Sequence, residues 1–321
     1  MPLYLTEQDV AQLLTMQEAV NALEEAFRRQ GSGEVVNQPR RRLHLPAGTY
    51  HTMVAGDIGL QTFGIKAYAS FPPKVRFLFL LYSAQNGDLL ALMEADKLGQ
   101  MRTGAASGVA TRHLAKSSGP LRVGIYGTGW QAQTQLEAIC AVREVAGIVA
   151  YGRDVERRAA FCAAMTERLG VPVTPAELPE EAAQKQDVVI TATTAREPVL
   201  RGEWLSHGAH VNAVGSNLLM KQEIDDETVR RSSVIVVDSI EQSKSESGDL
   251  LPPFERRLFR WEQVAELAEI VAGRRARRTD DAQITLFKSN GIAMEDVAVA
   301  TRVYQKAIAA GIGTQVPMWQ E

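Results

Sequence analysis

Hydrophobic positions near the start of the chain recur with the spacing of a helix. Ala19, Leu23 and Phe27 lie four residues apart, which places them on one face. A capping-box pattern, S/T-x-x-E, begins at Thr15 just before them, and a glycine pair follows from Gly31. The pattern predicts an amphipathic helix between Thr15 and Gly31, with its apolar face packed on the rest of the protein.

From residue 35 to residue 93 the pattern is typical of strands. Residues 64–71 and 77–82 favour strands, and Asn86-Gly87 separates the second of them from the apolar residues 89–93. Asn-Gly is typical of a type I′ hairpin turn, because both central residues of that turn need positive φ. Small residues dominate positions 103–115. They predict a tightly packed helix that begins at Arg102.

Beyond residue 120 short apolar runs alternate with helical stretches. The runs that indicate strands are 121–126, 147–151, 187–191, 210–214 and 234–238, followed by 284–287. Helical stretches lie between the first three, and residues 293–310 predict a closing helix rich in small and apolar side chains. This alternation predicts a parallel sheet covered by helices, and the Ser/Gly/Pro-rich segment 116–120 is the best boundary in front of it.

Composition and charge narrow the class of protein. Hydrophobic residues make up 45% and charged residues 23% of 321 positions, which fits a globular chain and excludes wholesale disorder. The net charge, 35 − 38 = −3, gives no reason to expect a nucleic-acid or membrane-surface partner. No signal peptide or bilayer-spanning run is visible, so we expect a cytoplasmic protein. Cys140 and Cys162 lack metal-site spacing, so no metal is expected.

The most specific local motif follows the strand 121–126. Gly127, Gly129 and Ala132 form G-x-G-x-x-A directly before a helical run. In a dinucleotide site the first glycine permits the tight turn, the second lets the backbone approach the pyrophosphate, and the third small residue keeps the helix close to its strand. Because the motif lies inside a βαβ pattern, we favour a cofactor loop over an ordinary glycine turn. Thr128 and Gln131 complete the candidate cofactor-binding residues of this loop.

The end of the second strand carries information on the type of cofactor. NAD sites usually place an acidic residue there for the ribose 2′-hydroxyl, whereas NADP sites use a basic residue for the 2′-phosphate. Here Gly152 occupies the expected acid position and Arg153 follows it. The sequence therefore favours NADP over NAD. The alternative is that Asp154 serves the ribose and Arg153 belongs only to the start of the helix.

Several ordered segments resemble one protein family. They are Gln38-Pro39-Arg40-Arg41, Gly64-Ile65-Lys66, Asn86-Gly87-Asp88, the segments 102–107, 211–215 and 238–249, and Phe287-Lys288-Ser289-Asn290-Gly291, together with the glycine loop. On these motifs the chain is similar to the ornithine cyclodeaminase/mu-crystallin family, which includes an archaeal-type alanine dehydrogenase and imine reductases. The match spans nearly the whole chain in family order.

The resemblance implies an α/β protein of two domains that forms a homodimer. A Rossmann-type, doubly wound parallel sheet would occupy residues 119–291. A smaller α+β domain for substrate binding and dimerisation would combine residues 1–118 with 292–321. In the family the active site lies between the two domains.

Three cationic residues match the family's substrate-binding positions. Arg41 matches the arginine that binds the substrate carboxylate, and guanidinium suits this task because it offers two parallel donors. Arg40 and Arg42 flank it, so the register is open, and a solvated basic strand edge is the alternative. Lys66 matches the family lysine near the substrate and is our candidate catalytic residue, since a partly desolvated amine suits proton transfer. Its alternative is an outward lysine on an amphipathic strand.

Arg102 is expected, by resemblance, to meet the substrate carboxylate and, with Thr103, the nicotinamide end of the cofactor. At the start of a helix a cation opposes the dipole, which favours a role in binding an anion. Further candidates for cofactor binding follow the ends of strands or match the family's nicotinamide segment. They are Thr191, Thr193, Val214, Ser289 and Gly291.

Asn217 separates two activities within the family. In the cyclodeaminases this position carries an aspartate that handles the substrate amine, and an amide does not take up a proton near neutral pH. The hydride chemistry of an imine needs no such aspartate, so Asn217 becomes a substrate-binding candidate. The sequence therefore predicts an NAD(P)-dependent reductase or dehydrogenase of a small α-imino or α-amino acid. A cyclodeaminase-type lyase with bound NAD and a mu-crystallin-like ligand-binding protein are the alternatives.

Overall fold

The computed structural model describes residues 1–318 and divides into two compact units. Unit 1 comprises Met1–Arg102 and the segment from Ile292 onward, and unit 2 comprises Thr103–Gly291. The first division falls within helix α3 (Asp96–Leu114), earlier in the chain than the boundary at 118/119 that the sequence suggested. The second division lies between Gly291 and Ile292.

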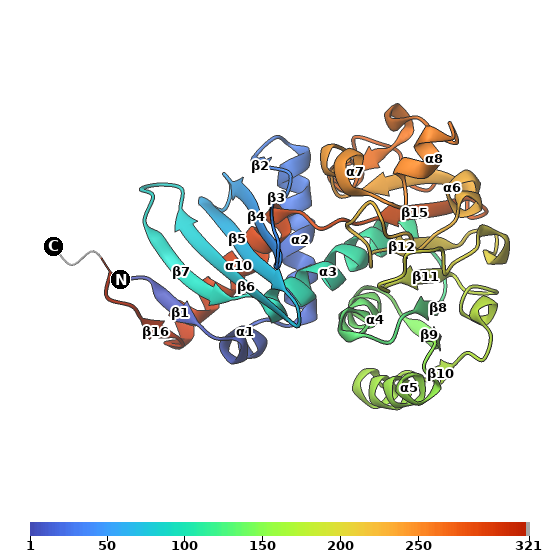
Figure 1. Ribbon diagram of the computed structural model, residues 1–321, viewed down its shortest axis with the longest axis horizontal. Helices are drawn as coiled ribbons and strands as arrows, with labels where there is room; N and C mark the ends of the chain where they lie inside the picture. Colours follow the sequence, from blue (N-terminus) through green and yellow to red (C-terminus); the bar gives the residue numbers. More distant parts are fainter. Residues whose placement is uncertain (319–321) are drawn as a thin grey trace. The chain divides into compact units, whose positions relative to one another are not determined.

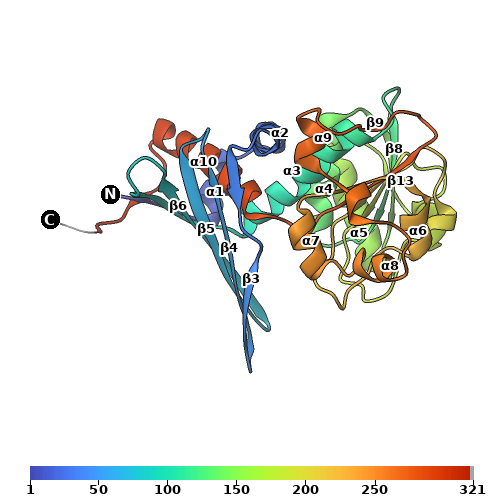
Figure 2. The ribbon, with the colours of Figure 1, turned by 90° about the horizontal axis from the view of Figure 1, so that it is seen from above.

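Unit 1 is built on a mixed sheet with strand order β16-β1-β7-β6-β5-β4-β2, and β3 pairs with β4 (Figure 1). The strands are β1 (Leu3–Leu5), β2 (Val35–Asn37), β3 (Arg41–Leu45), β4 (Gly48–Asp57), β5 (Thr62–Phe71), β6 (Lys74–Ser83), β7 (Leu89–Glu94) and β16 (Thr314–Gln315). Figure 2 shows the β3 end of this sheet extending past the helices of unit 1.

One face of this sheet is covered by helices. The helices are α1 (Glu7–Leu13), α2 (Met16–Gly31) and α10 (Ala293–Ala310), and α10 packs against β4, β5, β6 and α2. The alternation of strand side chains buries one cross-strand row on this face, Met53, Lys66, Phe79 and Met93. A lysine therefore stands in a row of otherwise apolar core residues.

The opposite face of the same strands carries a second cross-strand row. Its members are Val54, Ile65, Leu80 and Leu92, and each is only half-buried. An apolar sheet face that stays accessible is a feature of surfaces that bind another protein.

Unit 2 is a parallel sheet with strand order β10-β9-β8-β11-β12-β15-β13-β14. The strands are β8 (Leu121–Tyr126), β9 (Val145–Tyr151), β10 (Val173–Pro175), β11 (Val188–Thr191), β12 (His210–Ala213), β13 (Ser232–Val237), β14 (Ala265–Glu266) and β15 (Ile284–Lys288). The chain runs outward from β8 in one direction and then returns to build the other side from β11. This order is that of a doubly wound fold.

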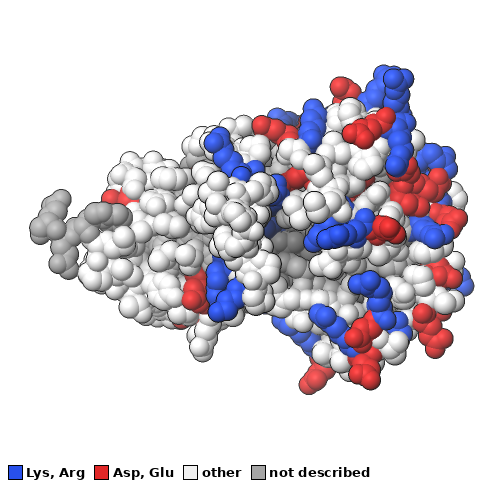
Figure 3. Space-filling view, in the orientation of Figure 1, with Lys and Arg blue, Asp and Glu red and all other residues white. Residues whose placement is uncertain are grey.

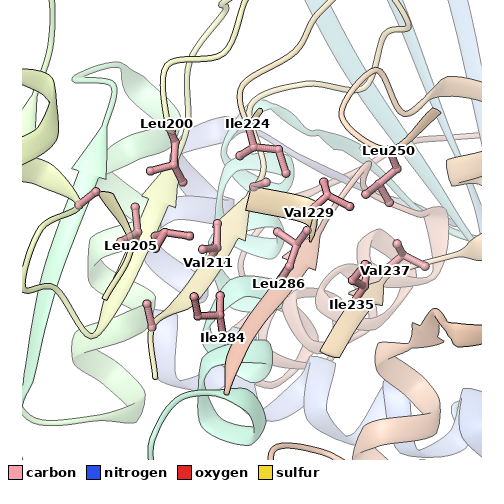
Figure 4. Packing of buried hydrophobic residues seen from close by; sticks show 14 of the residues in the cluster. Leu200, Leu205, Val211, Ile224, Val229, Ile235, Val237, Leu250, Ile284 and Leu286 are labelled. Carbon is pink, nitrogen blue, oxygen red and sulfur yellow. The ribbon is translucent and has the colours of Figure 1, made fainter. Parts of the chain in front are cut away.

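Helices cover both faces of the parallel sheet. They are α4 (Trp130–Val142), α5 (Val155–Leu169), α6 (Asp226–Arg231), α7 (Ile240–Glu246), α8 (Leu251–Glu255) and α9 (Leu267–Val271), with short 3₁₀ turns at Pro179–Ala182, Gly202–Trp204 and Trp261–Gln263. Within β11, Val188 and Ile190 join the core under α4 and α5, whereas Val189 joins the core on the other face. Figure 4 shows that second core, in which Val211 and Leu286 pack near Ile224 and Leu250.

The predicted α/β class and the Rossmann-type parallel sheet are therefore confirmed, and two local predictions were wrong. The β6–β7 connection is a hairpin, but only Gly87 has positive φ, because Asn86 instead accepts the Asp88 N–H with its side chain at 3.1 Å. Arg102 is not at a helix start. Helix α3 begins at Asp96, where the Glu7 carboxylate accepts the Asp96 and Lys97 N–H groups at 2.6 and 2.7 Å.

Candidate active site

The glycine turn between β8 and α4 has the geometry of an anion cradle. Gly127 has φ +107°, and a Cβ there would lie 2.4 Å from the Ala192 carbonyl oxygen, so only glycine fits. Gly129 is the N-cap of α4, and because glycine has no side chain, it does not cap the first N–H groups of the helix. A Cβ on Gly129 would meet nothing within 4 Å. An uncapped helix start beside open space fits the pyrophosphate of a dinucleotide.

The end of β9 also follows the pattern of a cofactor site. A Cβ on Gly152 would lie 3.0 Å from the Thr128 side chain, so a larger residue would press on the glycine turn. Asp154 is the N-cap of α5 and accepts the Arg157 N–H at 2.9 Å. Arg153 is exposed beside it. The carboxylate of this segment is thus engaged by the helix, and a basic side chain is accessible.

A buried carboxylate that sequence analysis missed holds the ends of β11 and β12 together. Glu223 accepts the Thr193 N–H and the Gly215 N–H, both at 2.6 Å, and the hydroxyls of Thr193 at 2.8 Å and Thr191 at 3.0 Å. Burial, followed by the nearby Asp249 carboxylate, raises the pKa of Glu223. The predicted cofactor residues Thr191 and Thr193, and the segment after Val214, are therefore tied to one side chain.

Two further buried acids order the segments after β15 and β12. Asp238 accepts the Ser289 hydroxyl at 2.9 Å and the Asn290 and Gly291 N–H groups at 2.7 and 2.6 Å. Asp249 accepts the Glu223 N–H at 2.6 Å. The predicted residues Ser289 and Gly291 thus lie in a segment that is fixed at the carboxyl edge of the sheet, where open α/β sheets bind ligands.

Lys288, at the end of β15, connects these acids to the loop that carries Asn217. Its ammonium lies 2.9 Å from Asp249 Oδ2 and donates to the Ser216 carbonyl at 2.6 Å. Asn217 follows Ser216 directly and is half-buried. The loop is therefore anchored immediately before the residue on which the choice between reductase and cyclodeaminase depends.

In unit 1 the structure brings Lys66 and Arg102 into one buried cluster with two acids. Lys66 Nζ lies 2.9 Å from Asp296 Oδ1, and Arg102 Nη1 lies 2.7 Å from Glu295 Oε2. Arg102 Nε is 3.4 Å from the same Asp296 oxygen. Burial lowers the pKa of Lys66, while the adjacent Asp296 raises it. The cluster combines a desolvated amine with a fixed guanidinium, which are the groups needed to move a proton and bind a carboxylate.

The three consecutive arginines near this cluster differ in burial. Arg40 is 8% exposed, Arg42 is half-buried, and Arg41 is exposed on β3 opposite Thr52. The charge of Arg40 helps to lower the pKa of Lys66. Burial, followed by the charges of Arg42 and Arg40, also lowers the pKa of His51 to about 4. Arg40, rather than Arg41, is therefore the buried arginine whose charge acts on Lys66.

Aromatic rings lie beside the buried lysine. His51 stacks on Tyr68 with ring centroids 4.2 Å apart, and Tyr68 stacks on Phe77 at 4.7 Å. Lys66 Nζ lies 5.1 Å from the centroid of the Phe77 ring. These rings form the row next to Lys66 on the same sheet face, and they offer an apolar, planar surface.

A signal for the two acids of the cluster is present in the sequence of the closing helix. Glu295-Asp296 are the only charged residues in the first turn of α10, and both are fully buried there.

Among the residues described, no group of three or more His, Cys, Asp or Glu side chains is arranged to hold a metal ion. Within residues 1–318, no helix has the length and apolar character needed to cross a bilayer.

Comparison with known proteins agrees with this geometry. The sequence model of the ornithine cyclodeaminase/mu-crystallin family matches residues 2–311. The chain is 35% identical to an alanine dehydrogenase of Archaeoglobus fulgidus over 328 residues, with 99% of each chain covered.

Solved structures give the same result. The Delta(1)-pyrroline-2-carboxylate reductase of Thermococcus litoralis, in complex with NADH and L-proline, is similar with a TM-score of 0.93 and 38% identity, over 98% of this chain and 100% of that one. An archaeal alanine dehydrogenase dimer with bound NAD is similar with a TM-score of 0.93 and 34% identity, over 99% of each chain.

Proposed function

Because the chain belongs to the ornithine cyclodeaminase/mu-crystallin family, we propose that it is a nicotinamide-dependent oxidoreductase that interconverts a small α-imino acid and the corresponding α-amino acid. The observation that carries the proposal is the buried cluster of Lys66, Arg102, Asp296 and Glu295. It offers a carboxylate-binding cation beside a desolvated amine, as reduction of a C=N bond next to a carboxylate requires.

The cofactor belongs to unit 2 in this proposal. The turn at Gly127 and Gly129 would hold the pyrophosphate, and the segments fixed by Glu223 and Asp238 would receive the nicotinamide end. When bound, the nicotinamide supplies the hydride for reduction or accepts it in oxidation. Gly152 and Arg153 support a preference for NADP, because the neighbouring Asp154 is engaged as a helix cap.

Arg40 and Arg102 would bind the substrate carboxylate. Both are buried cations, and Arg102 belongs to the cluster that contains Lys66. Arg102 directly precedes Thr103, whose carbonyl accepts the Gln135 side-chain N–H from α4 at 3.1 Å. Chain connectivity thus supports Arg102 and Thr103 as neighbours of both substrate and cofactor.

Lys66 would exchange the proton at nitrogen. In the direction of reduction the carbon of the C=N bond gains a hydride, and the electron pair of the π bond goes to nitrogen. That nitrogen takes a proton from the Lys66 ammonium, which leaves a neutral amine that solvent reprotonates. Asn217, an amide in place of an acid, supports this reductase assignment over a cyclodeaminase, because no carboxylate at that position handles the amine.

A homodimer would use the apolar sheet face of unit 1. The row Val54, Ile65, Leu80 and Leu92 offers a continuous apolar strip, and unit 1 carries few charged side chains on the face seen in Figure 3. A second copy of this chain is the occupant that we propose, as in the dimeric archaeal alanine dehydrogenase. We also propose a cytoplasmic location, since both cysteines are unpaired thiols.

The test measures oxidation of NADH and NADPH by the purified protein. The substrates are Delta(1)-pyrroline-2-carboxylate and the imines formed from small 2-keto acids with ammonia. We expect turnover with at least one of them, a lower KM for NADPH than for NADH, and a large loss of kcat in Lys66→Ala. Full turnover by Lys66→Ala would remove the proposed role of Lys66. Nucleotide binding without turnover of any imine would indicate a ligand-binding protein, and ammonia release from L-ornithine without net NAD(P)H change would indicate a cyclodeaminase.

A further inference from the structure

The two acids of the buried cluster come from adjacent positions of one helix and make their shortest contacts with different cations, although Arg102 Nε also lies 3.4 Å from Asp296 Oδ1. Asp296 and Glu295 lie in the first turn of α10, which packs against β4, β5 and β6. Asp296 makes its short contact with Lys66 on β5, at 2.9 Å, and Glu295 makes its short contact with Arg102 on α3, at 2.7 Å. Both carboxylates are completely buried. Neither their exposure nor their helix position distinguishes them, so the contacts assign their tasks.

We propose that Asp296 and Glu295 are positioning residues with separate tasks in the reaction proposed above: Asp296 keeps Lys66 charged as a proton donor, and Glu295 holds the Arg102 guanidinium in place for the substrate carboxylate. The inference rests on the proposed function for its kinetic consequences. Its physical basis is the pairing itself, which exists without substrate.

Lys66 needs a counter-charge because its burial and two neighbouring cations favour the neutral amine. Burial lowers the pKa of Lys66, and so do the charges of Arg102 from α3 and Arg40 before β3. The Phe77 ring on β6 and Gly99 on α3 also lie beside the ammonium, and a Cβ on Gly99 would lie 2.6 Å from Lys66 Nζ. Asp296 opposes these effects by its charge and by its hydrogen bond. Without the Asp296 charge, Lys66 would lose its proton at lower pH.

Glu295 acts on geometry rather than on protonation. A guanidinium stays protonated throughout the working pH range of proteins, so the Glu295 carboxylate does not decide the charge of Arg102. Its contact with Nη1 at 2.7 Å instead fixes the plane of the guanidinium fork. A freely rotating Arg102 would bind a carboxylate less well, because the side chain would have to be ordered during binding.

Two nearly isosteric variants on adjacent positions separate these tasks. The pH profile of kcat/KM for imine reduction is compared in the wild type, Asp296→Asn and Glu295→Gln. In Asp296→Asn the fall in activity at high pH should begin about one pH unit lower. In Glu295→Gln the KM for the imino acid should rise about tenfold while the midpoint stays at the wild-type pH. Asp296→Glu, which keeps the charge, should return the midpoint toward the wild type.

A direct titration makes the result independent of turnover. The ¹³Cε signal of Lys66, assigned with Lys66→Arg, is followed by NMR against pH in the wild type and in Asp296→Asn, with circular dichroism as the control for folding. A lower midpoint in the variant supports the inference even if no imine is turned over, in which case the proposed function alone fails. Coincident Lys66 midpoints, or an equal shift in Glu295→Gln, would overturn the inference while leaving an active reductase intact.

Discussion

Arg40 and Arg41 are adjacent but differ sharply in their surroundings. Arg40 is buried near Lys66, and Arg41 is exposed on β3. We predict that Arg40→Ala raises the KM for the imino acid about tenfold or more, since a charge-assisted bond to a carboxylate contributes about 1.5–3 kcal/mol. Arg41→Ala should change this KM less than twofold. Steady-state kinetics of the two variants shows which arginine binds the carboxylate. A larger rise in KM for Arg41→Ala than for Arg40→Ala would assign that role to Arg41.

Gly99 makes room for the end of the Lys66 side chain. It lies inside α3, where alanine is the better helix former by about 1 kcal/mol. A Cβ there would nevertheless lie 2.6 Å from Lys66 Nζ. Gly99→Ala should therefore lower kcat at least about tenfold and also lower the melting temperature, because Lys66 must move away from Asp296 and breaking a buried ion pair is destabilising. A wild-type kcat in Gly99→Ala would contradict this explanation.

Single residues show which parts of the site a sequence can reveal. Lys66 and Arg102 could be identified because they stand in motifs that resemble those of a family. The resemblance pointed to Arg41 but left open which of the three consecutive arginines binds the carboxylate. The alternation of side chains along one strand does not decide this unless the first residue of β3 is known. Asp296 remained hidden because its partner is 230 positions away in the chain. Its burial depends on how α10 returns to β5, and no local pattern records that return.

The β8–α4 turn contains two glycines that serve different purposes. Gly127 has positive φ and faces the Ala192 carbonyl, whereas Gly129 has ordinary φ and faces open space. Gly127→Ala should destabilise unit 2 by about 1–3 kcal/mol. Gly129→Ala should leave the melting temperature unchanged and weaken NADPH binding about tenfold or more, measured by fluorescence titration. Equal nucleotide affinity in Gly129→Ala and wild type would argue against a pyrophosphate at this turn.

The packing of α2 against α10 includes an acid whose charge depends on pH. Burial alone would raise the pKa of Glu18, but hydrogen bonds from Lys306 and from the Thr15 N–H and hydroxyl lower it to about 2. Because the folded pKa lies below the unfolded value near 4.5, the stabilisation is complete above that value. It is lost as the pH falls toward 2. Glu18→Gln should therefore lower stability by roughly 0.5 kcal/mol at pH 7. The difference from the wild type, followed by urea unfolding, should vanish near pH 2.

The observed bounds of helices and strands match the predicted ones where the sequence signals lie within or directly beside the element. The strand β8 and the closing helix α10 have the predicted bounds, since each is an uninterrupted periodic run with clear breaks at both ends. The start of α3 was misplaced by six residues, from Asp96 to Arg102. The first N–H groups of this helix are capped by the side chain of Glu7, which lies 89 positions earlier in the chain. A cap from so distant a residue leaves no signal in the sequence beside the helix.

At the level of the assembly, the apolar strip of unit 1 makes a prediction for the oligomeric state. Leu80 lies in the middle of that strip, between Ile65 and Leu92. In a symmetric dimer, Leu80→Glu would bring two charges into the apolar contact, which costs several kcal/mol. We expect the wild type to be a dimer and this variant a monomer in light scattering. Val155→Glu, on an exposed position of α5, is the matched control and should stay dimeric.

The origin of α10 from the last part of the chain has a consequence for synthesis on the ribosome. Residues 103–291 form a continuous unit, whereas Lys66 receives its counter-ion from a helix that leaves the exit tunnel after all of them. Until then an ammonium on β5 stays in contact with water, because burial of an unpaired charge costs several kcal/mol. The nascent sheet therefore keeps that face hydrated, and the lysine acquires its chemical character only after α10 has been translated.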